Sequence, residues 1–192
     1  RLMDVVGISQ RFVNAYPHEM DGGRRQRVGI ARALALQPQF IVCDEPVSSL
    51  DVSIQAQILN LLKDLQDEFH LTYLFITHDL SVVKFFSDHI AVMYLGQLVE
   101  TATAAELFQN TLHPYSQALL SAIPEASVRR KMKRVKLIGE LTSPIDPEPG
   151  CRFAKRCLYA QAGCTGADPE LRDFGNNHYC ACLRTQELEE RH

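Results

Sequence analysis

Two adjacent carboxylates directly follow one short apolar run, and a histidine follows a second one. Asp44 and Glu45 come after the run 40–43, and His78 comes two residues after the run 73–76. If both runs are parallel strands, their carboxyl ends meet at one edge of a sheet, where folds of this class bind ligands. Such a set supports phosphoryl transfer, which depends mostly on positioning and charge stabilisation. The alternative interpretation is a turn whose acidic residues cap the next helix.

A pair of glycines marks a second candidate site. Gly22 and Gly23 stand between Asp21 and Arg24, at the start of a helix that we predict over 24–36. Backbone N–H groups at a helix start can approach a phosphate closely, and the helix dipole favours its negative charge. A Gly-rich turn with Asp21 as an ordinary N-cap is the alternative.

Five of the six cysteines crowd the last 42 residues, whereas Cys43 lies in a predicted buried strand. In a cytosolic protein such a group is more typical of metal binding than of a disulfide framework. Four thiolates suit an iron–sulfur cluster or a structural Zn²⁺, and the lack of the paired C-x2-C of common zinc ribbons favours the cluster. Unligated reduced cysteines are the alternative. The five are Cys151, Cys157, Cys164, Cys180 and Cys182.

The elements that must position these residues follow from the apolar pattern. Residues 1 to about 110 alternate helical and strand patterns, which predicts an α/β unit with a largely parallel sheet. Between Asp51 and Phe69 the apolar residues recur at helical spacing, and Asp51 is suited to cap that helix. The predicted helices cover 24–36, 51–69, 80–86, 103–109 and 114–123. The predicted strands cover 40–43, 73–76, 90–94 and 97–100, and the last two flank Gly96 as a hairpin. A basic stretch at 129–136 and a Pro-rich linker at 144–149 precede the cysteine segment.

The totals for the chain limit its class. Its 192 residues are enough for one domain, or one and a fraction, with a buried core. The net charge of −3 does not suggest nucleic-acid binding. No apolar run approaches the roughly 18 residues that span a bilayer, so we expect any membrane association to go through a partner.

The order and spacing of these motifs resemble the second half of an ABC-transporter ATPase, which has a P-loop NTPase-like α/β core. The glycine pair matches the family signature, the strand before Asp44 the Walker B strand, and the segment 48–51 the D-loop. The resemblance implies that Asp44 helps to hold Mg²⁺ and ATP, that Glu45 polarises the attacking water, and that His78 senses the γ-phosphate. It also implies that the signature faces ATP held by a second subunit. The remaining residues with implied binding roles are Asp21, Gly22, Gly23 and Arg24 in the signature and Ser49 and Asp51 in the D-loop.

Two signature residues depart from the family pattern. Asp21 stands where the family usually has Ser, and Arg24 stands where it usually has Gln. An ionised carboxylate only accepts hydrogen bonds and repels a phosphate, whereas a hydroxyl can donate. Arg24 could neutralise Asp21 or reach the phosphate itself. We therefore expect a weakened or tuned composite ATP site in an asymmetric pair of subunits.

The phosphate-binding half of the motif set is missing. No Gly-Lys dipeptide occurs, so the P-loop pattern G-x-x-x-x-G-K-[ST] is absent from the chain. We expect the isolated chain neither to bind ATP tightly nor to hydrolyse it. The chain also begins with Arg1, within what looks like an amphipathic helix, which favours a piece of a longer protein.

Further segments narrow the resemblance to the oligopeptide, dipeptide and nickel importer group. They lie at 15–19, 51–57, 92–96 and 113–120. The tail is similar to the cysteine-bearing C-terminal extension of that group, in which four cysteines ligate a [4Fe–4S] cluster. The resemblance divides the chain into a nucleotide-binding half-domain, 1–110, and this extension, 111–192. By position it gives the ligand role to Cys151, Cys157, Cys164 and Cys182, with Cys180 as an alternate.

The resemblance implies a subunit that uses ATP hydrolysis to drive import of oligopeptides or dipeptides, bound peripherally to the cytoplasmic face of the cell membrane. The expected partners are a second ABC ATPase subunit in a heterodimer, transmembrane permease subunits and, indirectly, an extracytoplasmic solute-binding protein; nucleic acid is not expected. Two alternatives stay open. The missing P-loop favours a non-catalytic assembly or regulatory fragment, while the acidic net charge and the tail disfavour a DNA-maintenance ABC ATPase.

Overall fold

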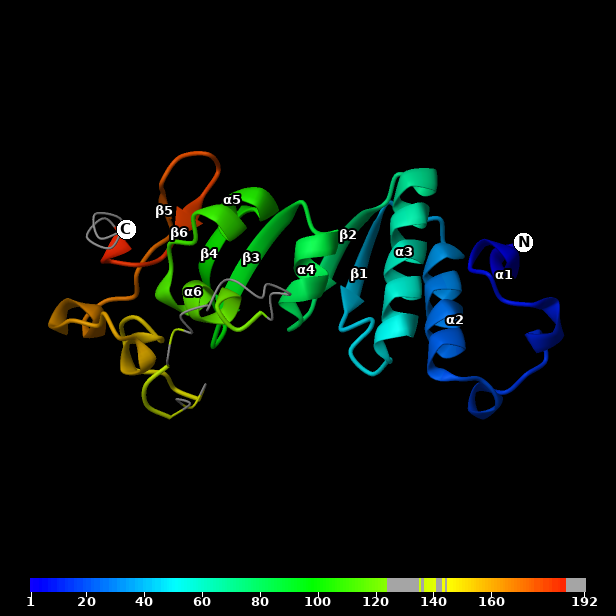
Figure 1. The fold of residues 1–192 in the computed structure, drawn as a ribbon, viewed down its shortest axis with the longest axis horizontal. Helices are drawn as coiled ribbons and strands as arrows, with labels where there is room; N and C mark the ends of the chain where they lie inside the picture. The colour runs from blue at the N-terminus through cyan, green and yellow to red at the C-terminus, as the bar shows by residue number, and fades with distance from the viewer. Residues whose placement is uncertain (124–134, 136, 141–142, 144, 186–192) are drawn as a thin grey trace, which may run out of the picture. The chain divides into compact units, whose positions relative to one another are not determined.

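The chain folds into two compact units in a computed structural model that describes residues 1–123, 135, 137–140, 143 and 145–185 (Figure 1). The first unit is Arg1–Val82 and the second is Val83–His192. The predicted basic stretch falls, apart from residue 135, outside the described residues. None of the described helices is both long enough and apolar enough to cross a membrane.

The first unit places helices against a short parallel sheet (Figure 1). Strands β1, Phe40–Asp44, and β2, Thr72–Ile76, pair in parallel with Asp44 opposite Ile76. Helix α3, Val52–Phe69, connects the two strands, and helix α2, Gly22–Leu34, precedes them. The remaining elements are α1, Leu2–Val5, η1, Gln10–Phe12, and η2, Pro17–Glu19, while α4, Leu80–Phe86, contains the division between the units.

Helix α3 forms where the apolar spacing predicts it. Its N-cap is Asp51, whose carboxylate accepts the Ile54 N–H at 3.0 Å. The helix ends at Phe69, and its C-cap residue His70 adopts a left-handed backbone with φ of 54°. Its buried stripe is Ile58, Leu59, Leu62 and Leu65. The cap and the stripe together confirm the predicted helix and its start.

The two glycines at the start of α2 allow close packing against the segment that leads into α3. A Cβ on Gly22 would lie 2.9 Å from Cδ2 of Leu50, and one on Gly23 would lie 2.7 Å from Cγ2 of Ile54. Neither glycine has a positive φ. These positions therefore require glycine for packing, because there is no space for a larger side chain.

One face of the β1–β2 sheet exposes apolar side chains. Alternate residues of both strands point to this face, because partners in a parallel register share a face. The exposed fractions are 54 % for Phe40, 54 % for Val42, 50 % for Leu74 and 46 % for Ile76. Parallel sheets in folded domains are usually covered by helices on both faces. The exposure of this face is therefore atypical of a parallel sheet.

The second unit is built on an antiparallel sheet with the order β3-β4-β6-β5. Strands β3, His89–Tyr94, and β4, Gln97–Thr103, form the predicted hairpin, and the tail adds β6, Tyr179–Cys180, and β5, Arg172–Asp173. Helices α5, Ala104–Gln109, and α6, Pro114–Leu120, follow the hairpin, and η3, Ala154–Arg156, and η4, Ala162–Thr165, lie in the cysteine segment. The core contains Ile90, Val92, Tyr94, Val99, Ala102, Leu107 and Phe153.

The expectation of a largely parallel sheet over residues 1 to about 110 is correct for β1 and β2, whereas the described strand pairs from residue 89 onward, the predicted hairpin among them, are antiparallel. The compact units also divide at residue 82, whereas the family resemblance divides the chain at 110. The hairpin belongs with the tail in packing terms because β4 pairs with β6, with Glu100 opposite Cys180. The division at 110 stays a prediction about family domains.

Candidate functional site

The carboxylate pair lies at the carboxyl edge of the parallel sheet, as predicted. Asp44 is the last residue of β1, and its side chain is exposed. Glu45 follows with a left-handed backbone, φ of 47°, and its N–H donates to the Ile76 carbonyl at 2.9 Å. Left-handed backbone at a non-glycine residue costs free energy and is common at functional sites. The bond to β2 holds Glu45 in this conformation.

Glu45 and His78 contact each other across the ends of the two strands. His78 Nδ1 lies 2.8 Å from Glu45 Oε1, and the side chains are 75 % and 41 % exposed respectively. The hydrogen bond to His78 holds the pKa of Glu45 below its ordinary value, and the same bond raises the pKa of His78. An exposed pair of this kind is available to a ligand at the sheet edge.

The loop between β1 and α3 is organised by local hydrogen bonds. Ser48 Oγ donates to the Glu45 carbonyl at 3.2 Å, and Ser53 Oγ donates to Asp51 Oδ1 at 2.6 Å. The bond from Ser53 is the main cause of the lowered pKa of Asp51. Asp51 therefore acts as a helix cap here, whereas Ser49 lies exposed in the loop.

The two unusual signature residues pair with each other. Asp21 caps α2 by accepting the Arg24 N–H at 2.8 Å, and Arg24 Nη1 lies 2.8 Å from Asp21 Oδ2. The Arg24 guanidinium also lies over the ring of Phe12, 4.7 Å from its centroid. Of the two roles proposed for Arg24, neutralising Asp21 is the one that this geometry displays.

The structure brings the predicted site residues together in two sets. Asp44, Glu45 and His78 share the sheet edge. The signature glycines contact the D-loop and the start of α3 through Leu50 and Ile54. The specific binding and catalytic roles of these residues stay predictions.

All four cysteines that the resemblance selects line one cavity in the second unit. The cavity has about 20 Å³ of free space, roughly enough for one water molecule, and its wall includes Cys151, Cys157, Cys164 and Cys182. The Cys151 N–H donates to the Cys164 carbonyl at 2.8 Å and joins two of the cysteine loops. Burial raises the pKa of Cys151 to about 11 and also raises that of Cys157. Cys180, the alternate, is fully buried in β6 and is not among the residues that line the cavity.

Within the described part of the chain, no group of three or more His, Cys, Asp or Glu residues is arranged so that it could hold a metal ion. The four sulfurs are therefore not preset for a single Zn²⁺, whose ligand atoms converge to about 2.0–2.3 Å from the metal. The four cysteines nevertheless line one cavity, and their role as ligands stays a prediction.

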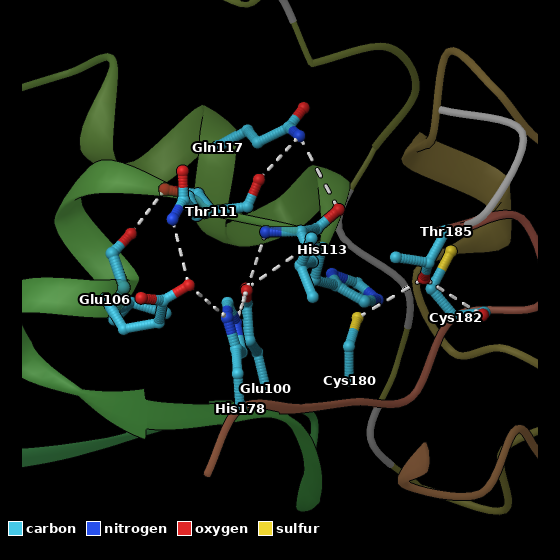
Figure 2. Close-up of polar contacts among 12 residues, drawn as sticks. Glu100, Glu106, Thr111, His113, Gln117, His178, Cys180, Cys182 and Thr185 are labelled. Carbon is cyan, nitrogen blue, oxygen red and sulfur yellow. Dashed lines mark hydrogen bonds and ion pairs between the residues drawn. The ribbon is translucent and has the colours of Figure 1, made fainter. Parts of the chain in front are cut away.

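A buried polar network next to this cavity was not predicted from the sequence (Figure 2). The Glu100 carboxylate is fully buried and accepts the backbone N–H groups of Leu112 at 2.7 Å and His113 at 3.1 Å. His178 Nε2 lies 2.8 Å from Glu100 Oε1, and His178 Nδ1 lies 3.7 Å from Glu106 Oε1. The sequence signal for this network was an acidic residue, Glu100, in the predicted strand 97–100. That signal does not identify the residues with which Glu100 pairs.

Comparisons with known proteins agree with the resemblance. The model for the ABC transporter family matches residues 1–48, and the model for the oligopeptide/dipeptide transporter C-terminal region matches residues 99–164. The oligopeptide transport ATP-binding protein AppF of Bacillus subtilis (strain 168) is 52 % identical over 183 residues, covering 94 % of this chain and 56 % of AppF. The dipeptide transport ATP-binding protein DppF of Escherichia coli (strain K12) is 48 % identical over 188 residues, covering 98 % of this chain and 56 % of DppF.

A solved structure supports the fold. The crystal structure of an ATP-binding cassette of an ABC transporter in its ADP conformation matches with a TM-score of 0.51 and 26 % identity, covering 57 % of this chain and 44 % of that chain. The chain spans a little over half the length of the curated relatives, 56 % of AppF and of DppF. It belongs to the ATP-binding proteins of the ABC transporter family, in the oligopeptide and dipeptide transporter group.

Proposed function

We propose that this chain is part of an ATP-hydrolysing subunit that drives import of oligopeptides or dipeptides across the cytoplasmic membrane. The observation that carries the proposal is the Glu45–His78 contact of 2.8 Å at the carboxyl ends of neighbouring parallel strands. Its relatives are described as oligopeptide and dipeptide transport ATP-binding proteins, which supports the same activity.

The proposed chemistry divides between the residues of the sheet edge. Asp44, exposed at the end of β1, would bind Mg²⁺ through the water shell of the ion. The lowered pKa of Glu45 keeps its carboxylate ionised and able to orient a water for attack. His78 holds Glu45 in place in the absence of nucleotide. When ATP is bound, the His78 imidazole would exchange this contact for one with the γ-phosphate.

The phosphates need a further surface, because the chain has no P-loop. The apolar face formed by Phe40, Val42, Leu74 and Ile76 is suited to a helix from the remainder of a nucleotide-binding domain, because parallel sheets are usually covered on both faces. We infer that such a remainder supplies the β- and γ-phosphate contacts beside Asp44 and Glu45.

We further infer a pair of unlike ATPase subunits on the cytoplasmic face of the membrane, working with permease subunits and a solute-binding protein. The signature of this subunit would then meet ATP held by the other one. Because Asp21 and Arg24 neutralise each other, the signature presents less positive charge to that ATP than a free arginine would. This supports a tuned composite ATP site. Unchanged ATP turnover in a transporter that carries both Asp21→Ser and Arg24→Gln would refute this proposal.

We also propose that Cys151, Cys157, Cys164 and Cys182 hold a [4Fe–4S] cluster, for which Zn²⁺ is the less favoured occupant. The shared cavity supports this ligand set. Binding would require loss of the thiol protons, which the raised pKa of Cys151 makes pH-dependent. Cys157→Ser should abolish binding of iron and sulfide, whereas Cys180→Ser should leave the amounts of both unchanged. The reverse result would mean that Cys180 is a ligand and Cys157 is not.

The test of the main proposal is ATP hydrolysis by a transporter assembled with this subunit. Glu45→Gln keeps the shape of the side chain but removes the charge, and we expect hydrolysis to fall by about 10²-fold or more, the usual contribution of a general base. The control is Glu68→Gln, an exposed position on α3 that should leave the rate unchanged. Hydrolysis by Glu45→Gln at the wild-type rate would refute the proposed role.

A further inference from the structure

Glu45 occupies a backbone conformation that needs support on both sides. Its φ of 47° lies in the left-handed region, which few non-glycine residues adopt, and the following Pro46 favours an extended conformation at the residue before it. Such a conformation persists only where the surrounding structure holds it. On the strand side, the hydrogen bond from the Glu45 N–H to the Ile76 carbonyl, at 2.9 Å, holds this residue. A second support is needed on the other side, after Pro46.

Figure 1 shows the loop that connects the end of β1 to the start of α3, and two successive turns make up this loop. In the first turn, the Glu45 carbonyl accepts the Ser48 N–H at 3.4 Å and the Ser48 hydroxyl at 3.2 Å. In the second turn, the Val47 carbonyl accepts the Leu50 N–H at 3.2 Å. The two turns overlap at Val47 and Ser48, so a displacement of Val47 would also displace Glu45.

One side chain of α3 anchors the part of the loop where the turns overlap. Gln55 Nε2 donates to the Val47 carbonyl at 2.9 Å, and the Gln55 N–H donates to the Asp51 carbonyl at 2.8 Å within the first turn of the helix. Val47 is 2 % exposed, so its carbonyl must find its donors within the fold. Because the Leu50 N–H belongs to the loop itself, Gln55 is the donor that fixes the loop to the helix.

We propose that Gln55 is a positioning residue for ATP hydrolysis, which acts through the Val47 carbonyl to hold Glu45 against His78. The inference rests on the proposed function, because it assigns Gln55 to the reaction in which Glu45 orients the attacking water. Loss of an interaction that is used only in the transition state lowers kcat and leaves KM unchanged. Gln55 should therefore affect the rate of hydrolysis and not the binding of ATP.

Substitutions at Gln55 separate its hydrogen bond from its bulk. Met has nearly the same length as Gln but no donor, so Gln55→Met removes the hydrogen bond and keeps most of the packing. Lys has a donor on a longer, flexible chain, so Gln55→Lys retains a group that can donate to the Val47 carbonyl. Gln57→Met is the matched control, because Gln57 is exposed on the same helix. Circular dichroism verifies that each variant is folded, and Gln55→Ala replaces Gln55→Met if that variant is not.

The first measurement uses the whole chain without nucleotide and reports on the contact between Glu45 and His78. The hydrogen bond to Glu45 is the main cause of the raised pKa of His78, so displacement of the carboxylate would let this pKa fall. In proton NMR titrations we expect a lower His78 pKa in Gln55→Met than in wild type, an intermediate pKa in Gln55→Lys and the wild-type pKa in Gln57→Met. A wild-type His78 pKa in the folded variant without the donor would overturn the inference.

The second measurement is steady-state ATP hydrolysis by a transporter assembled with each variant. We expect Gln55→Met to lower kcat by about 10-fold or more with KM unchanged, since misplacement by about 1 Å can cost up to about 10²-fold in rate. Gln55→Lys should recover part of the rate, and Gln57→Met should match wild type. A wild-type kcat in Gln55→Met would overturn the inference alone if Glu45→Gln is inactive. Hydrolysis by Glu45→Gln at the wild-type rate would overturn both the proposed function and the part of Gln55 in it.

Discussion

The glycine pair of the signature offers a test of packing that is separate from any role in nucleotide binding. In Gly23→Ala the added Cβ would lie 2.7 Å from Ile54 Cγ2 and 3.9 Å from Ile54 Cδ1. Carbon atoms prefer a separation of about 3.5–4.0 Å, so the shorter contact is roughly 1 Å too close. Ile is β-branched and stiff at χ1, so the side chain cannot simply rotate away.

Two opposing effects determine the size of the change in stability. Overpacking of this kind costs about 1–3 kcal/mol, and alanine in place of glycine within a helix contributes about 0.5–1 kcal/mol of stabilisation. We therefore expect Gly23→Ala to lower the free energy of unfolding by up to about 2.5 kcal/mol. Gly29 in the same helix is the matched control, because a Cβ there meets nothing within 4 Å. Gly29→Ala should raise stability by about 0.5–1 kcal/mol.

The assay is urea unfolding of the whole chain, followed by circular dichroism. The difference between the two variants isolates the contact with Ile54, and it should be about 1–3 kcal/mol. Combining Gly23→Ala with Ile54→Ala should recover part of the loss, as a favourable coupling energy in a double-mutant cycle. Equal stabilities for Gly23→Ala and Gly29→Ala would refute the packing explanation.

Four further predictions concern the sheet edge, the start of α3 and nucleotide binding by the isolated chain. Proton NMR should give His78 a pKa above 6.5 that falls in Glu45→Gln, since the hydrogen bond to Glu45 is the main cause of the shift. An unchanged His78 pKa in Glu45→Gln would show that the two side chains do not contact each other in solution. Because the folded-state pKa of His78 is raised and that of Glu45 is lowered, the stability that their contact contributes should be lost as pH rises through the His78 value and as it falls through the Glu45 value. Thermal unfolding of wild type and His78→Ala should therefore differ most between about pH 4.5 and 6.5. Asp51→Ala should cost about 1 kcal/mol in urea unfolding because α3 loses its N-cap, with Asp51→Asn close to wild type; equal losses would point to the charge instead of the cap. The isolated chain should show no tight binding of Mg-ATP by calorimetry, and a micromolar dissociation constant would contradict the need for an external P-loop.

The local elements of the first unit could be predicted closely, because their signals lie within a few residues of each other. The Asp51 cap and the apolar stripe of α3 matched their sequence patterns, and β1 and β2 each extend one residue beyond the predicted range. The meeting of Glu45 and His78 could also be predicted, because parallel strands joined by one helix bring their carboxyl ends to the same edge.

The same sequence patterns were insufficient for the second unit. The β3–β4 hairpin is local and was predicted, but its pairing with the tail joins Glu100 to Cys180 across 80 positions of the chain. No periodicity signals a contact at that separation. The division at residue 110 therefore does not match the packing units.

The sequence by itself determined what depends on residue type and short spacing. This includes the family, the order of motifs, the helix caps and the set of cysteines that could act together. Only the tertiary structure decided which groups meet. It buried Glu100 against His178 and placed His113 in the wall of the cysteine cavity. The physical reason is that a buried charge or imidazole is stable only with partners in place, and the fold alone brings those partners from distant parts of the chain.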